Sequence, residues 1–346
     1  MTAHFAAVVD RAAGVDISFN MIGIADVRGQ KLADMTLSDY MRPIELGAAS
    51  TTFPSTQTEI ETTKELHMTS LDTATTATAH RFEVPGASLH YEVRGQGPLI
   101  VLVGAPMDAS SFAPLADRLS TDHTVLTTDP RGINRSPLVD PDQDSTPEMR
   151  ADDLARLVSH LEAGPAVVFG SSGGAVSALA LVQAHPERVQ TVIAHEPPLE
   201  ELLDDREQRR AASDEIVATY LSRGRAAAWA KFLSDAGFAM PEPVFAEMFA
   251  GELDPQANAD ERFFFVHEMR ASSHWRPDLA ALRSVSRRIV VGIGEDSAGQ
   301  TCDHTSTALA TALGTEPTKF PGGHTGFVED PDAFAACLRD VLASTV

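Results

Sequence analysis

Cysteine and basic residues are both scarce in this sequence. Cys302 and Cys337 are the only cysteines among 346 residues, too few for a disulfide framework and too far apart for a paired-cysteine metal motif. Lysine and arginine together number 27 against 49 aspartates and glutamates, which gives a formal net charge of −22. Because phosphate-binding surfaces need clustered basic residues, we expect neither nucleic acid nor an anionic membrane as a partner.

The sequence also lacks a recognisable membrane span or signal peptide. The uncharged run 163–183 is long enough to cross a bilayer, but Pro165 and the central Gly-Ser-Ser-Gly-Gly favour a strand and a helix of a soluble core. Asp10, Arg11 and Asp16 interrupt the N-terminal apolar pieces, so no signal peptide is visible. We expect a cytoplasmic protein, and self-association into a homo-oligomer stays open.

The first 79 residues differ from the rest of the chain. Segments 15–24 and 35–44 resemble the middle of a short-chain dehydrogenase, but the phosphate-binding glycine motif and the Tyr-x-x-x-Lys pair are missing. Without those parts, residues 1–60 cannot hold a nicotinamide cofactor in the usual way. The stretch from about 50 to 79 is rich in Thr, Ser and Glu, as in flexible linkers. We expect residues 1–79 to be a non-catalytic extension and linker, with Met68 as an alternative start.

From residue 80 onward, predicted strands alternate with predicted helices. Apolar or alternating runs at the following places predict strands: 80–85, 88–94, 99–103, 124–128, 189–194, 288–293 and 317–320. Such alternation is typical of a mostly parallel sheet flanked by helices. A long helical and charged insertion at about 197–286 is expected to cap the carboxyl edge of that sheet, where such folds bind ligands. The sequence thus predicts one α/β domain over residues 80–346 with a helical cap.

The domain is organised around Gly170-Ser171-Ser172-Gly173-Gly174. A short apolar run precedes this segment, and a stretch of small uncharged residues follows it. Strand, tight turn and helix in this order form the Gly-x-Ser-x-Gly nucleophile elbow, whose strained turn lifts the serine hydroxyl clear of the sheet. Glycines are needed there because a Cβ would collide with the neighbouring strand or helix. Ser172 is therefore the candidate nucleophile.

Three motifs placed after predicted strands resemble those of the α/β-hydrolase family. They are, in chain order, Asp129-x-Arg131-Gly132-x-x-Arg135-Ser136, the elbow, and Pro321-Gly322-Gly323-His324. The resemblance covers residues 80–345 and implies an α/β-hydrolase fold with an oxyanion hole made by two backbone N–H groups. By position, those of Gly173 and Ala105 are the candidates. Many members have His-Gly before this loop, whereas this chain has Val103-Gly104.

His324 is the candidate catalytic base. Gly322-Gly323 before it and Gly326 after it indicate a loop that follows the last short strand, which is where the family keeps its base. In this role the imidazole would take the proton of Ser172 and later deliver it to the leaving alkoxide.

Two carboxylates compete for the third position of the triad. Asp296 lies in the loop after the predicted strand 288–293, the commonest family position, but Ser297 occupies the usual aspartate place. Glu196 follows the strand after the elbow helix. Its context, His195-Glu196-x-Pro198, resembles the fungal zearalenone lactonases, which take their acid from this strand. The resemblance implies Glu196, and Asp296 stays the alternative.

Met107, Ser171 and Trp275 are the candidate substrate-binding residues. Trp275 belongs to an aromatic-rich part of the predicted cap that begins at Phe263-Phe264-Phe265. Two explanations fit this stretch. It packs the cap on the core, or it forms an apolar wall for an aromatic or macrocyclic acyl group.

A serine nucleophile favours acyl transfer over dehalogenation or epoxide opening, which require a carboxylate nucleophile. We therefore predict a hydrolase of small carboxylic esters or lactones, such as the macrolactone zearalenone, that works through an acyl-enzyme with no cofactor and no metal. Two alternatives stay open. One is a carbon–carbon bond hydrolase of ring-cleavage ketones, and the other is a hydrolase-like binding protein.

Overall fold

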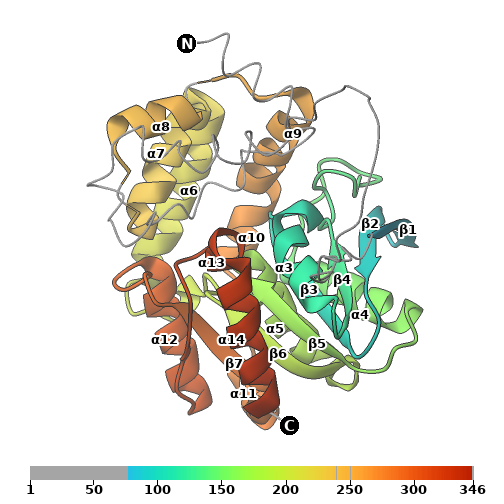
Figure 1. The fold of residues 1–346 in the computed structure, drawn as a ribbon. Coiled ribbons are helices and arrows are strands. Elements are labelled where there is room, and N and C mark those ends of the chain that lie inside the picture. Colours follow the sequence, from blue (N-terminus) through green and yellow to red (C-terminus); the bar gives the residue numbers. More distant parts are fainter. Residues whose placement is uncertain (1–76, 239, 250, 345–346) are drawn as a thin grey trace, which may run out of the picture.

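The computed structural model describes residues 77–238, 240–249 and 251–344 (Figure 1). Its centre is one eight-stranded sheet in the order β1-β2-β4-β3-β5-β6-β7-β8. The strands are β1 (Thr78–Val84), β2 (Ala87–Arg94), β3 (Leu99–Val103), β4 (Thr124–Thr128), β5 (Ala166–Ser171), β6 (Val189–His195), β7 (Ile289–Gly294) and β8 (Thr318–Phe320). The pairs β1–β2 and β2–β4 are antiparallel, and the other pairs are parallel. The predicted mostly parallel sheet is confirmed.

The dehydrogenase-like segment and almost all of the expected linker lie outside the described residues. Within the described ranges, no helix combines the length and the apolar character that crossing a membrane requires.

The central strand β3 shows why its sequence is a continuous apolar run. Leu99, Val101 and Val103 belong to the apolar core on one face of the sheet, and Ile100 and Leu102 belong to the core on the other face. Successive side chains of a strand point to opposite faces, so a strand covered on both sides needs apolar residues at every position.

Helices cover both faces of the sheet. One face carries α4 (Pro147–His160), α5 (Gly173–Ala184), α11 (Leu279–Ser284) and α12 (Thr301–Leu313). The other carries α3 (Ala113–Leu119), α13 (Gly326–Glu329) and α14 (Pro331–Ser344). Helix α4 begins at Pro147, because proline suits a first helical turn and the Thr146 hydroxyl accepts a hydrogen bond from the Met149 N–H (3.3 Å).

Within the described residues, the cap comprises five α-helices and one π-helical turn, Phe264–Glu268. The helices are α6 (Arg206–Arg223), α7 (Arg225–Ala236), α8 (Glu242–Phe249), α9 (Pro255–Phe263) and α10 (Met269–Ser273). Figure 1 shows α6, α7 and α8 grouped at the upper left, away from the sheet. They share an apolar cluster of their own around the buried Trp229. Leu282 of α11 instead belongs to the core against the sheet, although α11 lies within the range of about 197–286 expected for the cap.

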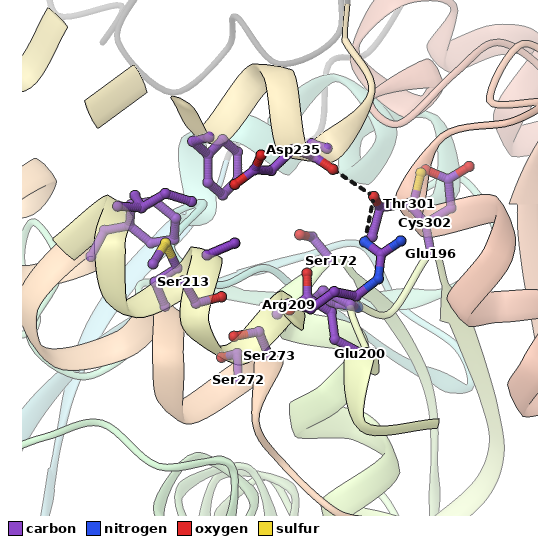
Figure 2. A pocket seen from close by; sticks show the side chains of 18 of the residues that line it. Ser172, Glu196, Glu200, Arg209, Ser213, Asp235, Ser272, Ser273, Thr301 and Cys302 are labelled. Carbon is purple, nitrogen blue, oxygen red and sulfur yellow. Dashed lines mark hydrogen bonds between the residues drawn. The ribbon is translucent and has the colours of Figure 1, made fainter. Parts of the chain in front are cut away.

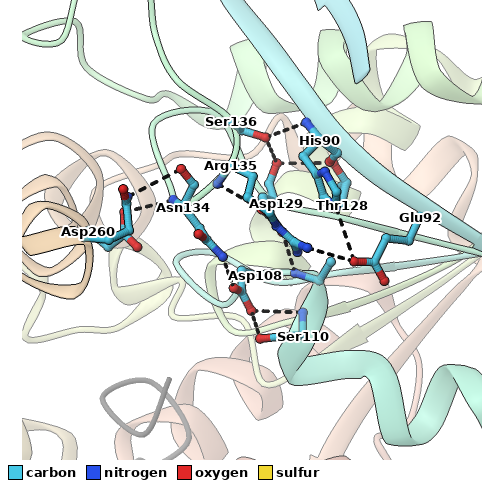
Figure 3. A network of polar contacts seen from close by, with 12 residues as sticks. His90, Glu92, Asp108, Ser110, Thr128, Asp129, Asn134, Arg135, Ser136 and Asp260 are labelled. Atoms are coloured by element: carbon cyan, nitrogen blue, oxygen red, sulfur yellow. Dashed lines mark hydrogen bonds and ion pairs between the residues drawn. The ribbon is translucent and has the colours of Figure 1, made fainter. Parts of the chain in front are cut away.

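A polar network fixes the loops that follow β3 and β4 (Figure 3). The buried Asp129 carboxylate accepts hydrogen bonds from the Ala109 N–H (3.0 Å) and from the Arg135 guanidinium (2.8 and 2.9 Å). The Asn134 side-chain amide donates to Asp108 (2.6 Å), and its backbone N–H donates to Asp260 of α9 (2.8 Å). The Asp-x-Arg-Gly-x-x-Arg-Ser turn therefore holds the loop that contains Ala105 and ties the cap to the core.

Candidate active site

Ser172 lies at the tip of the turn between β5 and α5. Its backbone has φ 57° and ψ −127°, a region that residues with a side chain seldom occupy. Its N–H donates to the carbonyl of His195 at the end of β6 (3.0 Å), which fixes the turn against the neighbouring strand. The serine is therefore held in a strained conformation at the carboxyl edge of the sheet, as the motif predicts.

The glycines of the turn are required by close backbone contacts. A Cβ on Gly170 would lie 2.4 Å from the carbonyl oxygen of Gly174, and a Cβ on Gly174 would lie 2.1 Å from that of Val103. Both distances are too short for a carbon and an oxygen, and backbone atoms cannot rotate away as a side chain can. The turn can thus pack between β3 and α5 only with glycine at these positions.

Glu196 and His324 form a close carboxylate–imidazole pair. Glu196 directly follows β6 and is fully buried, with φ 53°. Its Oε2 lies 2.6 Å from His324 Nδ1, and its Oε1 accepts a hydrogen bond from the Gly294 N–H (2.7 Å). Burial opposes ionisation of this carboxyl, but the hydrogen bond with His324 and the nearby imidazoles lower the pKa of Glu196 well below its usual range. The pair leaves Nε2 as the imidazole nitrogen available for a proton transfer.

Asp296 lies elsewhere. It is exposed on the turn after β7, and none of the contacts among the described residues joins it to His324. What this turn supplies near the pair is the Gly294 N–H and the buried Ser297, whose hydroxyl contributes to the lowered pKa of Glu196. Of the two carboxylates considered from the sequence, the structure brings Glu196 to the imidazole.

The two candidate oxyanion donors lie side by side. Gly173 is the first residue of α5, so its N–H has no acceptor inside the helix and lies at the positive end of the helix dipole. A Cβ on Gly173 would come within 2.5 Å of the Ala105 carbonyl oxygen, which shows how closely the two loops approach. Ala105 and Gly173 both line the cavity that also contains Ser172 and His324.

This cavity has a volume of about 350 Å³, within the range of small-molecule sites. One part of its wall is apolar and comes from the cap, with Ile216, Phe232, Phe238, Phe264 and Met269. Another part is polar and includes Glu200, Arg209, Asp235 and Thr301, with Arg209 donating to Thr301 Oγ1 (3.1 Å; Figure 2). The aromatic stretch of the cap therefore both packs the cap and lines the cavity, since Phe264 lines the cavity while Phe265 packs in the cap core.

The three candidate substrate-binding residues lie outside this cavity, which corrects that expectation. Ser171 is fully buried, and its hydroxyl contacts His195 Nδ1 (3.3 Å). Met107 is buried in the core under α3 and α14. Trp275 is 6 % exposed in the core around α4 and α5, and its Nε1 donates to Glu148 (2.7 Å).

The residues that do line the cavity from the cap could not be singled out from the sequence. Ile216 and Phe232 occur at ordinary helical spacing, and their position depends on how α6 and α7 fold back over the sheet. Glu200 and Glu268 also line the cavity, but the predicted cap contains many other acidic residues, so their charge does not distinguish them in the sequence.

Among the described residues, only Glu196, Cys302 and His324 bring three ligand-type atoms within 4.8 Å of one another. The donor set is a poor fit for a metal ion. Burial and the Glu196 charge raise the pKa of the Cys302 thiol, so this group stays protonated, and metals bind the thiolate. The other two groups are already hydrogen-bonded to each other.

Comparison with known proteins agrees with the fold described above. Residues 99–337 match the model of the alpha/beta hydrolase family. The chain belongs to that family. A hydrolase of Bacillus subtilis (strain 168), YraK, itself uncharacterised, is 34% identical over 273 residues, which cover 75% of this chain and 94% of YraK. The protein is therefore a hydrolase, as expected.

More distant relatives carry named activities. A zearalenone hydrolase of Bionectria ochroleuca is 26% identical over 266 residues, which cover 72% of this chain and 92% of that enzyme. Among solved structures, a thermophilic esterase from Thermogutta terrifontis superposes with a TM-score of 0.57 at 21% identity, covering 77% of this chain and 99% of that one. Est816, described as an N-acyl homoserine lactone degrading enzyme, has a TM-score of 0.57 at 20% identity, covering 75% and 99%. The likeness to these two structures concerns the alpha/beta hydrolase fold.

Proposed function

We propose that this alpha/beta hydrolase cleaves carboxylic esters, and lactones in particular, through an acyl-enzyme formed on Ser172. The observation that carries the proposal is the contact of 2.6 Å between His324 Nδ1 and Glu196 Oε2, on the same cavity as the strained Ser172. A serine, an imidazole and a buried carboxylate converging on one cavity are the requirements of nucleophilic acyl transfer.

In the first half-reaction, Ser172 Oγ attacks the ester carbonyl carbon while His324 Nε2 takes its proton. The carbonyl oxygen becomes an oxyanion, for which the N–H groups of Gly173 and Ala105 are the proposed donors. The intermediate then collapses, the C–O bond to the alcohol breaks, and the imidazolium gives its proton to the leaving alkoxide. For a lactone, the alcohol and the acyl group remain one molecule on the enzyme.

In the second half-reaction, a water molecule attacks the acyl-enzyme, and His324 takes the proton of that water. The second tetrahedral intermediate releases Ser172 and the carboxylic acid. Throughout, the Glu196 carboxylate holds the imidazole with Nδ1–H toward itself and stabilises the positive charge that forms on the ring. Its low pKa keeps it charged at neutral pH.

A lactone substrate is supported by two observations. The first is that the zearalenone hydrolase of Bionectria ochroleuca aligns with this chain over 92% of its own length. The cavity of about 350 Å³ has a broad apolar wall from α6, α7 and the π-helical turn, which suits an aromatic or macrocyclic group. We therefore propose a small molecule as the ligand. Neither nucleic acid nor a membrane is proposed as a partner.

A substrate panel tests the proposal. Purified protein is incubated with p-nitrophenyl esters, macrolactones including zearalenone, and aromatic ring-cleavage ketones, and products are identified by mass spectrometry. We expect a gain of one water by esters and lactones, and loss of that activity in Ser172→Ala. Cleavage of the ketones alone would favour the carbon–carbon hydrolase, and no turnover of any compound would favour a binding protein.

A further inference from the structure

One of the polar stretches that the cap contributes to the cavity lies at the end of its only described π-helical turn. In this turn, Phe264–Glu268, the Met269 N–H donates to the Phe264 carbonyl, five residues back. A π-turn widens the helix and changes the direction of the side chains that follow, and such turns occur frequently at functional sites. Glu268 ends the turn, and Ser272 and Ser273 follow in α10. All three residues line the cavity.

Two of these buried side chains have unpaired polar atoms. Glu268 is 1 % exposed and Ser273 is 6 % exposed. Within the part of the chain that the structure describes, Glu268 Oε2 and Ser273 Oγ have no hydrogen-bond partner. Buried polar atoms are nearly always paired, and leaving one unpaired is unfavourable. Because both residues line the cavity, a group of a bound ligand can pair with these atoms.

Ser272 differs from Ser273 because it has a fixed donor. The buried Arg150 guanidinium donates to Ser272 Oγ (2.8 Å), and it also donates to Ser177 Oγ (2.8 Å) and to the Ser145 carbonyl (2.6 Å). Since the Ser272 oxygen accepts from Arg150, its own proton remains available to another acceptor. Figure 2 shows Ser272 and Ser273 together, on the side of the cavity opposite Thr301 and Cys302.

The charges around this stretch select against ionic groups. The buried Arg150 does not line the cavity, but it interacts electrostatically with Glu268 and donates to Ser272, so its positive charge disfavours a cation at this stretch. An anion at this stretch would meet Glu268, whereas the cation of the wall, Arg209, lies in its other polar part with Glu200 and Asp235. A neutral group that both donates and accepts hydrogen bonds avoids these conflicts, and a hydroxyl is the smallest such group.

We propose that Glu268, Ser272 and Ser273 form a subsite that binds a neutral hydroxyl group of the substrate, at a distance from the scissile ester. The proposal rests on the proposed ester hydrolysis and specifies its substrate class: esters or lactones that carry a hydroxyl. Burial raises the pKa of Glu268 to about 7, against the effect of Arg150, so near neutral pH this carboxyl can either accept from or donate to that hydroxyl.

The test uses paired esters that differ only in one hydroxyl. One series consists of p-nitrophenyl alkanoates and their ω-hydroxy counterparts over a range of chain lengths, and a second of alkyl and ω-hydroxyalkyl acetates. For wild-type protein we expect kcat/KM to favour the hydroxylated member about tenfold or more at one chain length in at least one series. Glu268→Gln and Ser273→Ala should each reduce this preference several-fold.

Glu201→Gln is the matched control. Glu201 is a buried glutamate beside the cap, but it pairs with Arg210 and Arg276 (2.6 Å to the latter) and does not line the cavity. This variant should keep the hydroxyl preference. Because Ser273 Oγ has no hydrogen bond to Arg150 in the described part of the chain, the Ser273→Ala result also separates loss of the subsite from disturbance of the guanidinium.

The outcomes separate the two proposals. Ester hydrolysis without any hydroxyl preference, or with a preference that survives in both variants, would overturn the subsite and leave the esterase intact. If no ester is hydrolysed, the proposed function fails. The subsite is then tested by calorimetry, which compares the binding of anilides of the same acids with and without the hydroxyl group. Equal affinity for hydroxylated and deoxygenated anilides would then overturn it.

Discussion

Replacing Glu196 by glutamine probes the carboxylate–imidazole pair with the least change of shape. The carboxylate now accepts two hydrogen bonds, one through Oε2 with His324 Nδ1 (2.6 Å) and one through Oε1 from the Gly294 N–H (2.7 Å). Glutamine has one accepting oxygen and one donating NH₂ group. Whichever way the amide turns, one of the two contacts places a donor against a donor.

The size of the effect follows from those contacts. A hydrogen bond to a charged group is worth about 1.5–3 kcal/mol, and a buried group left without its partner costs about 1–3 kcal/mol. Their sum is comparable with the about 3–5 kcal/mol that corresponds to a loss of 10²–10⁴ in turnover when a triad acid becomes an amide. We therefore expect Glu196→Gln to lower kcat by that factor.

The assay is steady-state hydrolysis of a p-nitrophenyl ester, with circular dichroism to establish that each variant is folded. Asp296→Asn is the matched comparison, because Asp296 is exposed and does not contact His324 among the described residues. It should keep a kcat near that of wild type. A crippled Asp296→Asn enzyme beside a nearly normal Glu196→Gln enzyme would refute the reasoning and assign the acid to the turn after β7.

Three further predictions concern packing, pH and the N-terminal residues. Gly174→Ala should lower the free energy of unfolding by about 1–3 kcal/mol or more in urea titrations, since its Cβ would lie 2.1 Å from the Val103 oxygen, whereas Gly251→Ala, with open space around it, should change little. The pKa of Glu268 is raised to about 7 in the folded protein, so the stability that its neutral carboxyl provides is complete below pH about 4.5 and is lost as the pH rises through 7. Glu268→Gln should therefore become more stable relative to wild type, by up to about 3 kcal/mol, between pH 4.5 and 7.5, and a difference that does not vary with pH would contradict this. A chain that begins at Met68 should keep the turnover number of the full chain, and loss of activity with folding intact would show that the preceding residues help to build the site.

The sheet and the elbow could be predicted because their signals are local. The apolar run 99–103 needs no distant information to be read as a strand buried on both faces, and the glycines around Ser172 are required by contacts within one turn and its neighbouring strand. The pairing of Glu196 with His324 depends on residues 128 positions apart in the chain, and the sequence alone kept two carboxylates as candidates. Only the resemblance to a known family pointed to Glu196.

The residues of the cavity wall could not be predicted from the sequence, because their position depends on how the cap folds over the sheet. Trp275 is a large aromatic residue in the right region of the chain, yet its ring packs in the core and its Nε1 donates to Glu148. Ser171 is adjacent to the nucleophile, yet its side chain is fully buried, contacts His195 and does not line the cavity. The π-helical turn that brings Glu268 to the cavity has no sequence signature that we could recognise.

Covalent labelling tests the central claim, that Ser172 is the nucleophile, most directly. The protein is treated with a fluorophosphonate, which reacts with activated serines, digested, and mapped by mass spectrometry. We expect one adduct on the peptide that contains Ser172, none in Ser172→Ala, and a loss of turnover of about 10⁴-fold or more in that variant with folding intact. An adduct on a different serine, or full activity in Ser172→Ala, would contradict the account.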